Sequence, residues 1–380
     1  MIHLDLFAGA GGWSTAASRL GTRLVGLELD TAACDTRSAA GHATISTDIT
    51  TFPTGPLAPG VIGMTASPPC QSWSAAGKRL GLIDQPLVHR AVADLAAGHD
   101  TRSELRTRCA DPRSLLAAEP MRFLAALNEH HLPQWLLMEA VPAVLPLWHQ
   151  YAHVLRGWGF STWHGLLNAA DFGVPQTRVR ATLIATRTGV ASPPEPTHAR
   201  NGEPDTLWGP ARRRWVSMAE ALGWGATDRP APTLCAGGPP TGGPEPFPTG
   251  SRRALAAARD RGTWKSPFAS EEGAREPKSS NQANAAVRQL TEPVGTLFFG
   301  HRADEYTWIR QPATHGAVPP DIKITPAEAG ILQTFSDDYP WQGTKSQQVN
   351  QIGNAIPPLF AEHLLAPHLV RTRDDYGLAA

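Results

Sequence analysis

The chain has 380 residues, of which 41% are hydrophobic, and its 34 Lys and Arg balance 34 Asp and Glu, so the formal net charge is zero. This length is enough for two or three domains with a sizeable core, and no apolar run approaches the roughly 20 residues that a membrane-spanning helix needs. The N-terminus shows no signal-peptide pattern and the four cysteines form no C-x-x-C pair, so we expect a cytoplasmic protein with no metal site and no disulfide framework.

The first 50 residues predict a strand, a glycine turn and a helix, followed by a second strand. Residues 2–7 form the first strand, and Gly9 and Gly11 belong to the turn. The second strand covers residues 23–29 and ends near Glu28. Glycines let the backbone approach a ligand closely, and a carboxylate about 20 residues further on can bind ribose hydroxyls. The turn lacks the full G-x-G-x-x-G pattern, so a nucleoside is favoured over a pyrophosphate, and a Rossmann oxidoreductase fits nothing after this region. Asp48 could accept from an adenine amino group, or it could be a turn residue.

A cysteine lies in a stiff loop after the next predicted strand. The apolar stretch Pro59–Ala66 leads into Ser67-Pro68-Pro69-Cys70-Gln71, whose two prolines cannot continue a sheet ladder. Cys70 should therefore lie at the carboxyl edge of the sheet, where open α/β folds bind ligands. This place suits a nucleophile. A buried, inert cysteine is the alternative.

Two later segments carry candidate functional groups: a general acid in the first and two arginines that could bind a nucleobase in the second. Glu139 follows the apolar run Trp135–Met138, which predicts another parallel strand, and it could be a general acid or a helix-starting carboxylate. In the segment 176–180, alternation places Arg178 and Arg180 on one face of a strand. Their guanidinium groups could clamp a base carbonyl, a phosphate or Glu139, or they could belong to an ordinary solvated strand face.

In this order, these stretches resemble the motifs of the DNA cytosine-5 methyltransferase family, from Asp5 to about Leu365. The matching segments are Asp5-Leu-Phe-Ala-Gly-Ala-Gly-Gly12, Glu28 with Asp30, Asp48, Ser67-Pro-Pro-Cys-Gln71, Glu139, Gln176-Thr-Arg-Val-Arg180 and Gln351-Ile-Gly-Asn-Ala-Ile-Pro-Pro358. Residues 72–81 also look like the family's mobile catalytic loop.

The resemblance implies a catalytic set, a cofactor and a nucleic-acid substrate. Cys70 would attack C6 of a flipped-out cytosine, and Glu139, Arg178 and Arg180 would complete the catalytic set. The methyl donor would be S-adenosylmethionine, held by Phe7, Gly9, Gly11, Glu28, Asp48, Pro68 and Asn354. Double-stranded DNA would be contacted by Gln71, Ser74, Arg212, Arg213 and Arg214.

The implied fold is α/β: a doubly wound, Rossmann-like methyltransferase sheet with a second, smaller and irregular target-recognition domain. We expect the catalytic domain at residues 1–187, target recognition at 188–290, and a return to the catalytic domain at 291–380. From Ala191 to Gly250, 12 Pro and 9 Gly make up 21 of 60 residues, too many for a regular α/β continuation. The run 212–214 beside Trp215 suits DNA contacts, or it could be a plain loop-rich surface. The chain begins with a strand and lacks the helix that precedes this strand in many doubly wound methyltransferases. A helix from Leu359 to about Val370 would occupy the position of that missing helix.

The chain departs from the family pattern twice. Ala140 stands where the family usually has the Asn of Glu-Asn-Val, and the segment Leu82–Ala110 is longer than in typical bacterial members. This 82–110 segment could extend the catalytic loop over DNA, or it could be a solvated surface helix. A tRNA cytosine-5 methyltransferase and an inactive DNA-binding paralogue are the alternatives. The long Pro/Gly-rich region argues against the first, and the intact Cys70 and Glu139 argue against the second. We expect a monomer without membrane contact, with a cognate restriction endonuclease as a functional rather than a physical partner.

Overall fold

The computed structural model describes residues 2–69, 71–73, 80–128, 133–205, 207, 209–223, 274–276, 286–288, 292–297, 307–308, 322–323 and 325–374. Cys70 and Ser74 therefore lie outside the described residues, as does much of the predicted recognition region.

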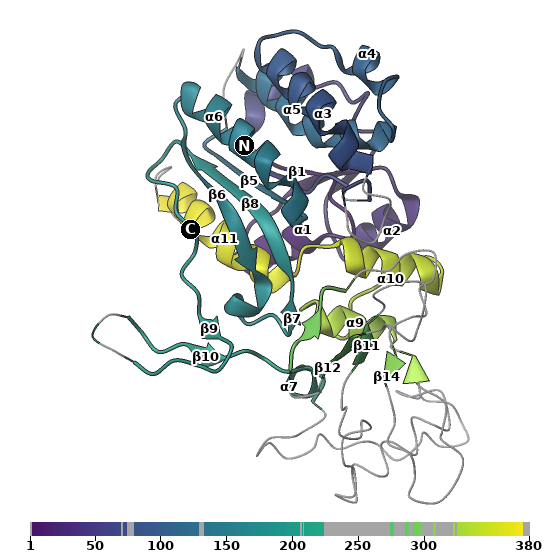
Figure 1. Cartoon of the computed structure of the whole chain (residues 1–380), viewed down its shortest axis with the longest axis vertical. Coiled ribbons are helices and arrows are strands. Elements are labelled where there is room, and N and C mark those ends of the chain that lie inside the picture. The colour runs from purple at the N-terminus through teal and green to yellow at the C-terminus, as the bar shows by residue number, and fades with distance from the viewer. Residues whose placement is uncertain are drawn as a thin grey trace, which may run out of the picture.

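A seven-stranded sheet, in the order β3-β2-β1-β4-β5-β8-β6, forms the centre of the molecule (Figure 1). Strand β8 runs opposite to the other six strands of this sheet, which all point the same way. The strands are β1 (Ile2–Leu6), β2 (Val25–Glu28), β3 (Thr44–Ser46), β4 (Val61–Ala66), β5 (Trp135–Ala140), β6 (Ser161–Asn168) and β8 (Val179–Thr186). Because β2 and β4 flank β1, the strand order reverses at β1, and ligands of open α/β sheets bind at such a switch point. The predicted α/β, Rossmann-like sheet is confirmed, and the structure shows it to be mixed.

Strands β4 and β5 form where the sequence is apolar without interruption. All six residues of each strand are buried, as expected for parallel strands that are covered on both faces. The strands predicted from residues 2–7, 23–29, 59–66 and 135–138 are all present, with ends that differ by one or two residues.

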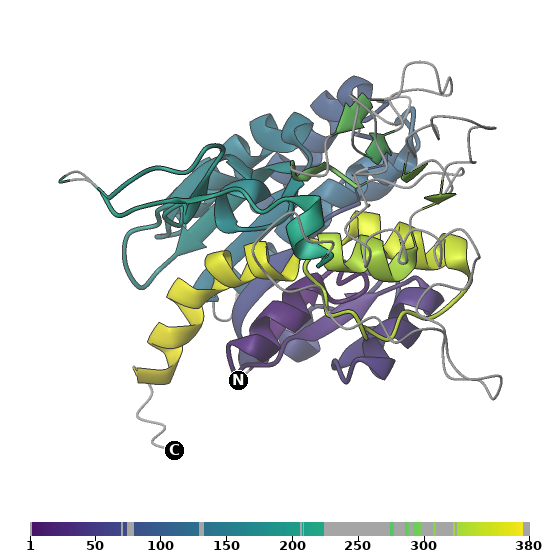
Figure 2. The same ribbon diagram turned by 90° about the horizontal axis from the view of Figure 1, so that it is seen from below.

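Helices cover both faces of the sheet. On one face α3, α5 and α6 pack in the larger core cluster, and on the other α1 and α11 pack in a second cluster (Figures 1 and 2). The helices of this domain are α1 (Gly12–Arg19), α2 (Thr31–Ala39), α3 (Leu80–Ala96), α4 (Arg102–Arg106), α5 (Glu119–Asn128), α6 (Leu145–Gly157), α9 (Pro326–Leu332), α10 (Lys345–Asn354) and α11 (Pro358–Asp374). Short 3-10 helices lie at Gly55–Gly60, Pro112–Ala118, Pro142–Val144 and Ala169–Phe172. In the part of the chain that the structure describes, no helix combines the length and hydropathy needed to cross a membrane.

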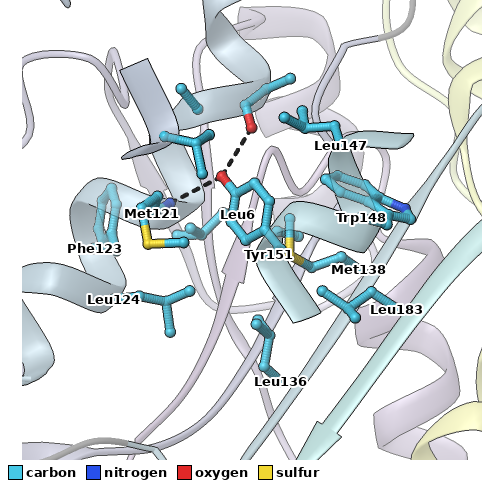
Figure 3. Packing of buried hydrophobic residues seen from close by; sticks show 14 of the residues in the cluster. Leu6, Met121, Phe123, Leu124, Leu136, Met138, Leu147, Trp148, Tyr151 and Leu183 are labelled. Atoms are coloured by element: carbon cyan, nitrogen blue, oxygen red, sulfur yellow. Dashed lines mark hydrogen bonds between the residues drawn. The ribbon is translucent and has the colours of Figure 1, made fainter. Parts of the chain in front are cut away.

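A buried tyrosine joins the larger cluster to the backbone beside it. Tyr151 of α6 packs among apolar side chains from strands and helices, and its hydroxyl accepts from Met121 N at 3.1 Å and donates to Ala117 O at 2.9 Å (Figure 3). A buried hydroxyl needs such partners, because leaving it unpaired costs about 1–3 kcal/mol. The two bonds fix α6 against the start of α5.

The C-terminal helix takes the place that was expected for it. Helix α11 packs against α1 through Phe360, Ala361 and Leu364, and Glu362 pairs with Arg19 at 2.7 Å. The last helix of the chain thus covers the sheet beside the first glycine turn.

The 82–110 segment contains α4 and most of α3. The interpretation of a solvated surface helix is wrong for α3, because Val88, Ala91, Val92 and Leu95 are buried in the larger cluster. Asp84 is buried too, and it accepts from the backbone N–H groups of residues 110 and 111. The segment therefore contributes to the larger core cluster beside the central sheet.

Short elements lie outside the central sheet. They are β7 (Gln176–Thr177) with β13 (Val294–Gly295), β9 (His198–Ala199) with β10 (Arg213–Arg214), α7 (Met218–Ala221), and a four-stranded sheet of β11 (Ala274–Glu276), β12 (Ala286–Arg288), β14 (Thr307–Trp308) and β15 (Ile322–Lys323). Strands β9 and β10 lie on an excursion of the chain away from the central sheet (Figure 1). The four-stranded sheet takes strands from both sides of residue 290.

Candidate active site

A cavity of about 480 Å³ opens at the carboxyl edge of the central sheet. It is lined by residues that follow β1, β2, β3 and β4, by the end of β5, by the start of β8 and by one face of α10. Because β8 is antiparallel, its first residues meet the last residues of the parallel strands. The cavity brings together Phe7, Gly9, Glu28, Asp48, Pro68, Gln71, Glu139, Arg178, Arg180 and Asn354.

The turn after β1 is tied to the end of β2 by a carboxylate. Oε2 of Glu28 accepts from Gly9 N at 2.7 Å, and Oε1 accepts from Leu29 N and Asp30 N, both at 2.8 Å. A carboxylate has about four acceptor positions, two on each oxygen, so Oε2 can still accept from a hydroxyl in the cavity. Phe7 has a φ of 58°, a conformation that costs a non-glycine residue about 1–2 kcal/mol. The turn is therefore a strained and fixed structure.

Asp48 lies in the loop after β3. Its Oδ1 accepts from Thr50 N at 2.9 Å and from Thr50 Oγ1 at 2.8 Å. These hydrogen bonds hold the pKa of the carboxyl below its ordinary value. Asp48 thus faces the cavity as a carboxylate whose orientation its own loop has set.

Glu139 and Arg180 form an ion pair at the opposite end of the cavity. Nε of Arg180 lies 2.7 Å from Oε1 of Glu139, and both side chains are less than a tenth exposed. Glu139 belongs to β5 and Arg180 to β8, which pair as neighbours. The alignment of the two groups is not that of a hydrogen bond, so the contact is chiefly electrostatic.

The prediction that residues 176–180 form one strand is wrong. Strand β7 pairs with β13, β8 pairs with β5 and β6, and Arg178 lies between them. Buried Gln176 explains the break, because it bonds Gln333 and accepts from Leu297 N, which holds β7 outside the main sheet. Arg178 still lines the cavity beside Arg180, and it donates to Gly353 O at 2.9 Å.

Helix α10 closes the cavity with amide side chains. Gln347, Asn350, Gln351 and Asn354 line it, and their spacing of three or four residues places them on one helical face. Only Asn354 was predicted. The same spacing, counted back from Asn354, could have identified the other three.

Several predicted residues lie elsewhere. Gly11, the N-cap of α1, does not line the cavity, and a side chain there would meet His42 at 2.7 Å and the hydroxyl of Tyr339 at 3.1 Å. Arg213 and Arg214 form exposed β10, and Arg212 pairs with Glu203 at 3.3 Å. Cys70 is not among the described residues, but Pro69 and Gln71 on either side of it line the cavity.

The cavity therefore has two chemically different ends. We call the end with Phe7, Gly9, Glu28 and Asp48 the β1–β3 side, and the end with Glu139, Arg178 and Arg180 the β5–β8 side. The first offers carboxylates and a close backbone, which suit a nucleoside. The second offers an acid and two guanidinium groups, which suit a polar base. Within the described ranges, no three His, Cys, Asp or Glu side chains gather in a way that could hold a metal ion.

Comparison with known proteins supports one family. The sequence model of the C-5 cytosine-specific DNA methylase family matches residues 1–88, 98–207 and 260–368. The Type II methyltransferase M1.HphI of Haemophilus parahaemolyticus is 26% identical, over 95% of this chain and 85% of that protein. The Type II methyltransferase M.DdeI of Desulfomicrobium norvegicum is 24% identical, over 95% and 86%.

Solved structures share the fold. The S. pombe Dnmt2 methyltransferase superimposes with a TM-score of 0.58 at 15% identity, over 98% of this chain and 99% of that one. A DNA modification methyltransferase encoded within an E. coli prophage gives a TM-score of 0.55 at 19% identity, over 98% and 99%.

The family match extends over most of the chain, the relatives align along nearly its whole length, and the central sheet is that of the solved methyltransferases. The chain belongs to the C-5 cytosine-specific DNA methylase family, and it is a DNA (cytosine-5-)-methyltransferase.

Proposed function

We propose that the enzyme methylates C5 of cytosine in duplex DNA through a covalent bond between Cys70 and C6 of a base that has left the helix. One observation supports this proposal: the cavity has an end lined by carboxylates and close backbone and an end lined by Glu139 and two arginines, and Pro68, Pro69 and Gln71 line it as well. A methyl donor and a cytosine could thus approach each other within one cavity.

The β1–β3 side fits the adenosine part of S-adenosylmethionine, the donor that the family implies. Oε2 of Glu28 retains one acceptor position for a ribose hydroxyl, and Asp48 can accept from the adenine amino group. Phe7 and Pro68 supply apolar surface, and Asn354 supplies an amide. A cavity of about 480 Å³ is in the range of cofactor sites. When bound, this donor supplies the methyl group as an electrophile.

The β5–β8 side fits the pyrimidine. C5 of cytosine is a weak nucleophile, and addition of the Cys70 thiolate to C6 converts the ring to an enamine that can take a methyl group. Glu139 would supply a proton to N3 during this addition. Arg180 would hold the Glu139 carboxyl in place, and Arg178 would bind the base carbonyl. The C5 proton would then pass to solvent water, the bond from sulfur to C6 would break and return the Cys70 thiolate, and the N3 proton would return to Glu139, which releases the methylated base.

Base flipping follows from the burial of the acid. The Glu139 side chain is about 5% exposed, so it cannot reach N3 of a base that is stacked in a duplex. Enzymes with this problem swing the target nucleotide into the pocket, at a cost of a few kcal/mol.

We further propose that residues 188–290 form the target-recognition domain between the two parts of the catalytic domain, 1–187 and 291–380. The arginines 212–214 would contact phosphates, and Gln71 and Ser74 would contact the DNA near the target base. The Type II methyltransferases among the relatives support a restriction-modification role, in which methylation protects the sequence that a cognate endonuclease would cut. We propose that the enzyme acts as a monomer and does not bind this endonuclease.

Sequencing of methylated DNA tests this function. Genomic DNA from cells that express the wild type or Cys70→Ala should be compared by bisulfite or nanopore sequencing. We expect 5-methylcytosine at one short sequence with the wild type only. Methylation of tRNA but not DNA would favour the tRNA alternative, and no methylation of either would favour an inactive DNA-binding protein.

A further inference from the structure

The loop that carries Asp48 is held from outside the cavity by three charged side chains. We call Arg102, Glu119 and Arg122 the arginine brace. Arg102 lies at the start of α4 in the 82–110 segment, whereas Glu119 and Arg122 lie on α5. Elements that are far from β3 in the sequence therefore contact the loop that follows it.

The brace contacts the loop through backbone carbonyls. Arg122 donates to Phe52 O at 2.9 Å and to Ile49 O, and Arg102 donates to Thr50 O at 3.4 Å. The carbonyls of three loop residues thus accept from two guanidinium groups. On the cavity side, Thr50 donates to Asp48, so each face of the loop has its own hydrogen bonds.

Glu119 joins the two arginines. Its Oε1 accepts from Arg102 at 2.5 Å, and its Oε2 accepts from Arg122 at 2.9 Å. The Glu119 side chain is only 4% exposed, and the arginines are 17% and 14% exposed. A buried carboxylate with two cationic partners is costly to disrupt, because loss of one partner leaves charge without compensation.

Arg102 has little freedom for another partner. It also donates to both oxygens of Asp100, at 2.8 and 2.7 Å. Since the guanidinium is already bound to two carboxylates and one carbonyl, a DNA phosphate would have to displace them. Arg108, six residues further on, is more than half exposed and lies 3.6 Å from Glu104 of the same helix region.

We propose that the arginine brace positions the methyl donor by fixing the loop that carries Asp48, and that the 82–110 segment acts through Arg102 on donor binding rather than on DNA. This inference rests on the proposed donor site. Arg102, Glu119 and Arg122 are positioning residues, since none of them lines the cavity.

Steady-state kinetics of the full chain separate donor binding from DNA binding. We expect Arg102→Ala to raise the KM for S-adenosylmethionine about tenfold, the scale of one lost charge-assisted hydrogen bond, and to change kcat by less than about twofold. Arg102→Lys should recover part of the loss, because it keeps a charge beside Glu119. Arg108→Ala is the matched control and should leave both parameters unchanged.

The competing role as a DNA contact makes a different prediction. A lost phosphate contact would lower the slope of log affinity against log salt by about 0.9. A lower slope for Arg102→Ala with an unchanged donor KM would overturn the proposal. We expect the wild-type slope.

A double-mutant cycle tests whether the brace acts through Asp48. Asp48→Ala and Arg102→Ala should each weaken donor binding, and the double variant should lose less than the sum of both. Full additivity would contradict the proposal. If Asp48→Ala itself leaves donor affinity unchanged, the proposed donor site is wrong, which is a separate result. Should Arg102→Ala fail to fold, Glu119→Gln removes the joining charge with little change of shape and should raise the donor KM in the same way.

Discussion

The two ends of the cavity are held in different ways. On the β1–β3 side, Glu28 accepts from backbone N–H groups of its own turn and of the turn after β1, and Asp48 accepts from Thr50 of its own loop. On the β5–β8 side, Glu139 and Arg180 chiefly contact each other across two strands. The first arrangement depends on backbone groups that the fold fixes, so we expect it to keep its geometry with and without a ligand, whereas the second depends on the positions of two side chains.

This difference separates two kinds of kinetic effect. A fixed carboxylate that binds the donor equally before and during reaction contributes to KM, whereas an acid that acts only during the reaction contributes to kcat. Substitutions on the β1–β3 side should therefore raise the donor KM, and substitutions on the β5–β8 side should lower kcat.

The largest effect is expected at Glu139. Glu139→Gln keeps the shape of the side chain but removes its acidic proton, so we expect the rate of methyl transfer to fall by about 10²-fold or more, the usual scale for a general acid. Tritiated methyl transfer to DNA under donor saturation measures this rate. Glu104→Gln, at an exposed position, is the control. A rate within about threefold of the wild type would remove Glu139 from the catalytic set.

The arginines at 212–214 lie outside the cavity and are proposed to contact DNA phosphates. Replacing all three by Ala should lower the salt slope of DNA binding by up to about 2.7, at about 0.9 for each phosphate contact. When salt rises from about 50 to about 200 mM, the DNA affinity of the triple variant should therefore fall by a factor about 40 times smaller than that of the wild type. The donor affinity should stay constant. An unchanged salt slope in fluorescence anisotropy titrations would assign these arginines to the solvated surface.

Ala140 tests the tolerance of the β5–β8 side. Ala140 is buried next to Glu139 and also lines the cavity, and in the proposed mechanism Glu139 alone carries the transferred proton. Ala140→Asn should change the rate by less than about tenfold. Activity that appears only in this variant would instead identify the wild type as an inactive paralogue.

The smallest effect is expected at Tyr339. Its hydroxyl donates to Ala10 O at 2.6 Å, which ties the turn after β1 to a residue far along the chain. Tyr339→Phe should raise the dissociation constant of the donor by about fivefold, equivalent to one neutral hydrogen bond of about 1 kcal/mol. Isothermal titration calorimetry measures it. An equal loss of DNA affinity would mean a general weakening of the fold.

Local sequence was enough to predict the parts of the fold that depend on local pattern. Strands β4 and β5 are continuous apolar runs because both of their faces are buried, and the link between Glu28 and Gly9 follows from adjacent parallel strands. The cavity gathers ten of the predicted site residues, most of them because strand ends share one edge, whereas Asn354 reaches it from α10.

Contacts between distant segments could not be predicted in this way. The break at Arg178 depends on pairing with β13, more than a hundred residues later. The arginine brace depends on three segments that meet only in the folded chain. In both places a distant segment of the chain decided the structure, and the local pattern of alternation or charge did not indicate that partner.

Covalent trapping tests the central claim most directly. Duplex DNA with 5-fluorocytosine at the target should form a stable complex with the enzyme and S-adenosylmethionine, because fluorine cannot leave in the elimination step that frees the cysteine. Cys109→Ala should trap as the wild type does, and Cys70→Ala should trap none. Mass spectrometry of the adduct should identify Cys70. Equal trapping by Cys70→Ala, or an adduct on another residue, would contradict the account.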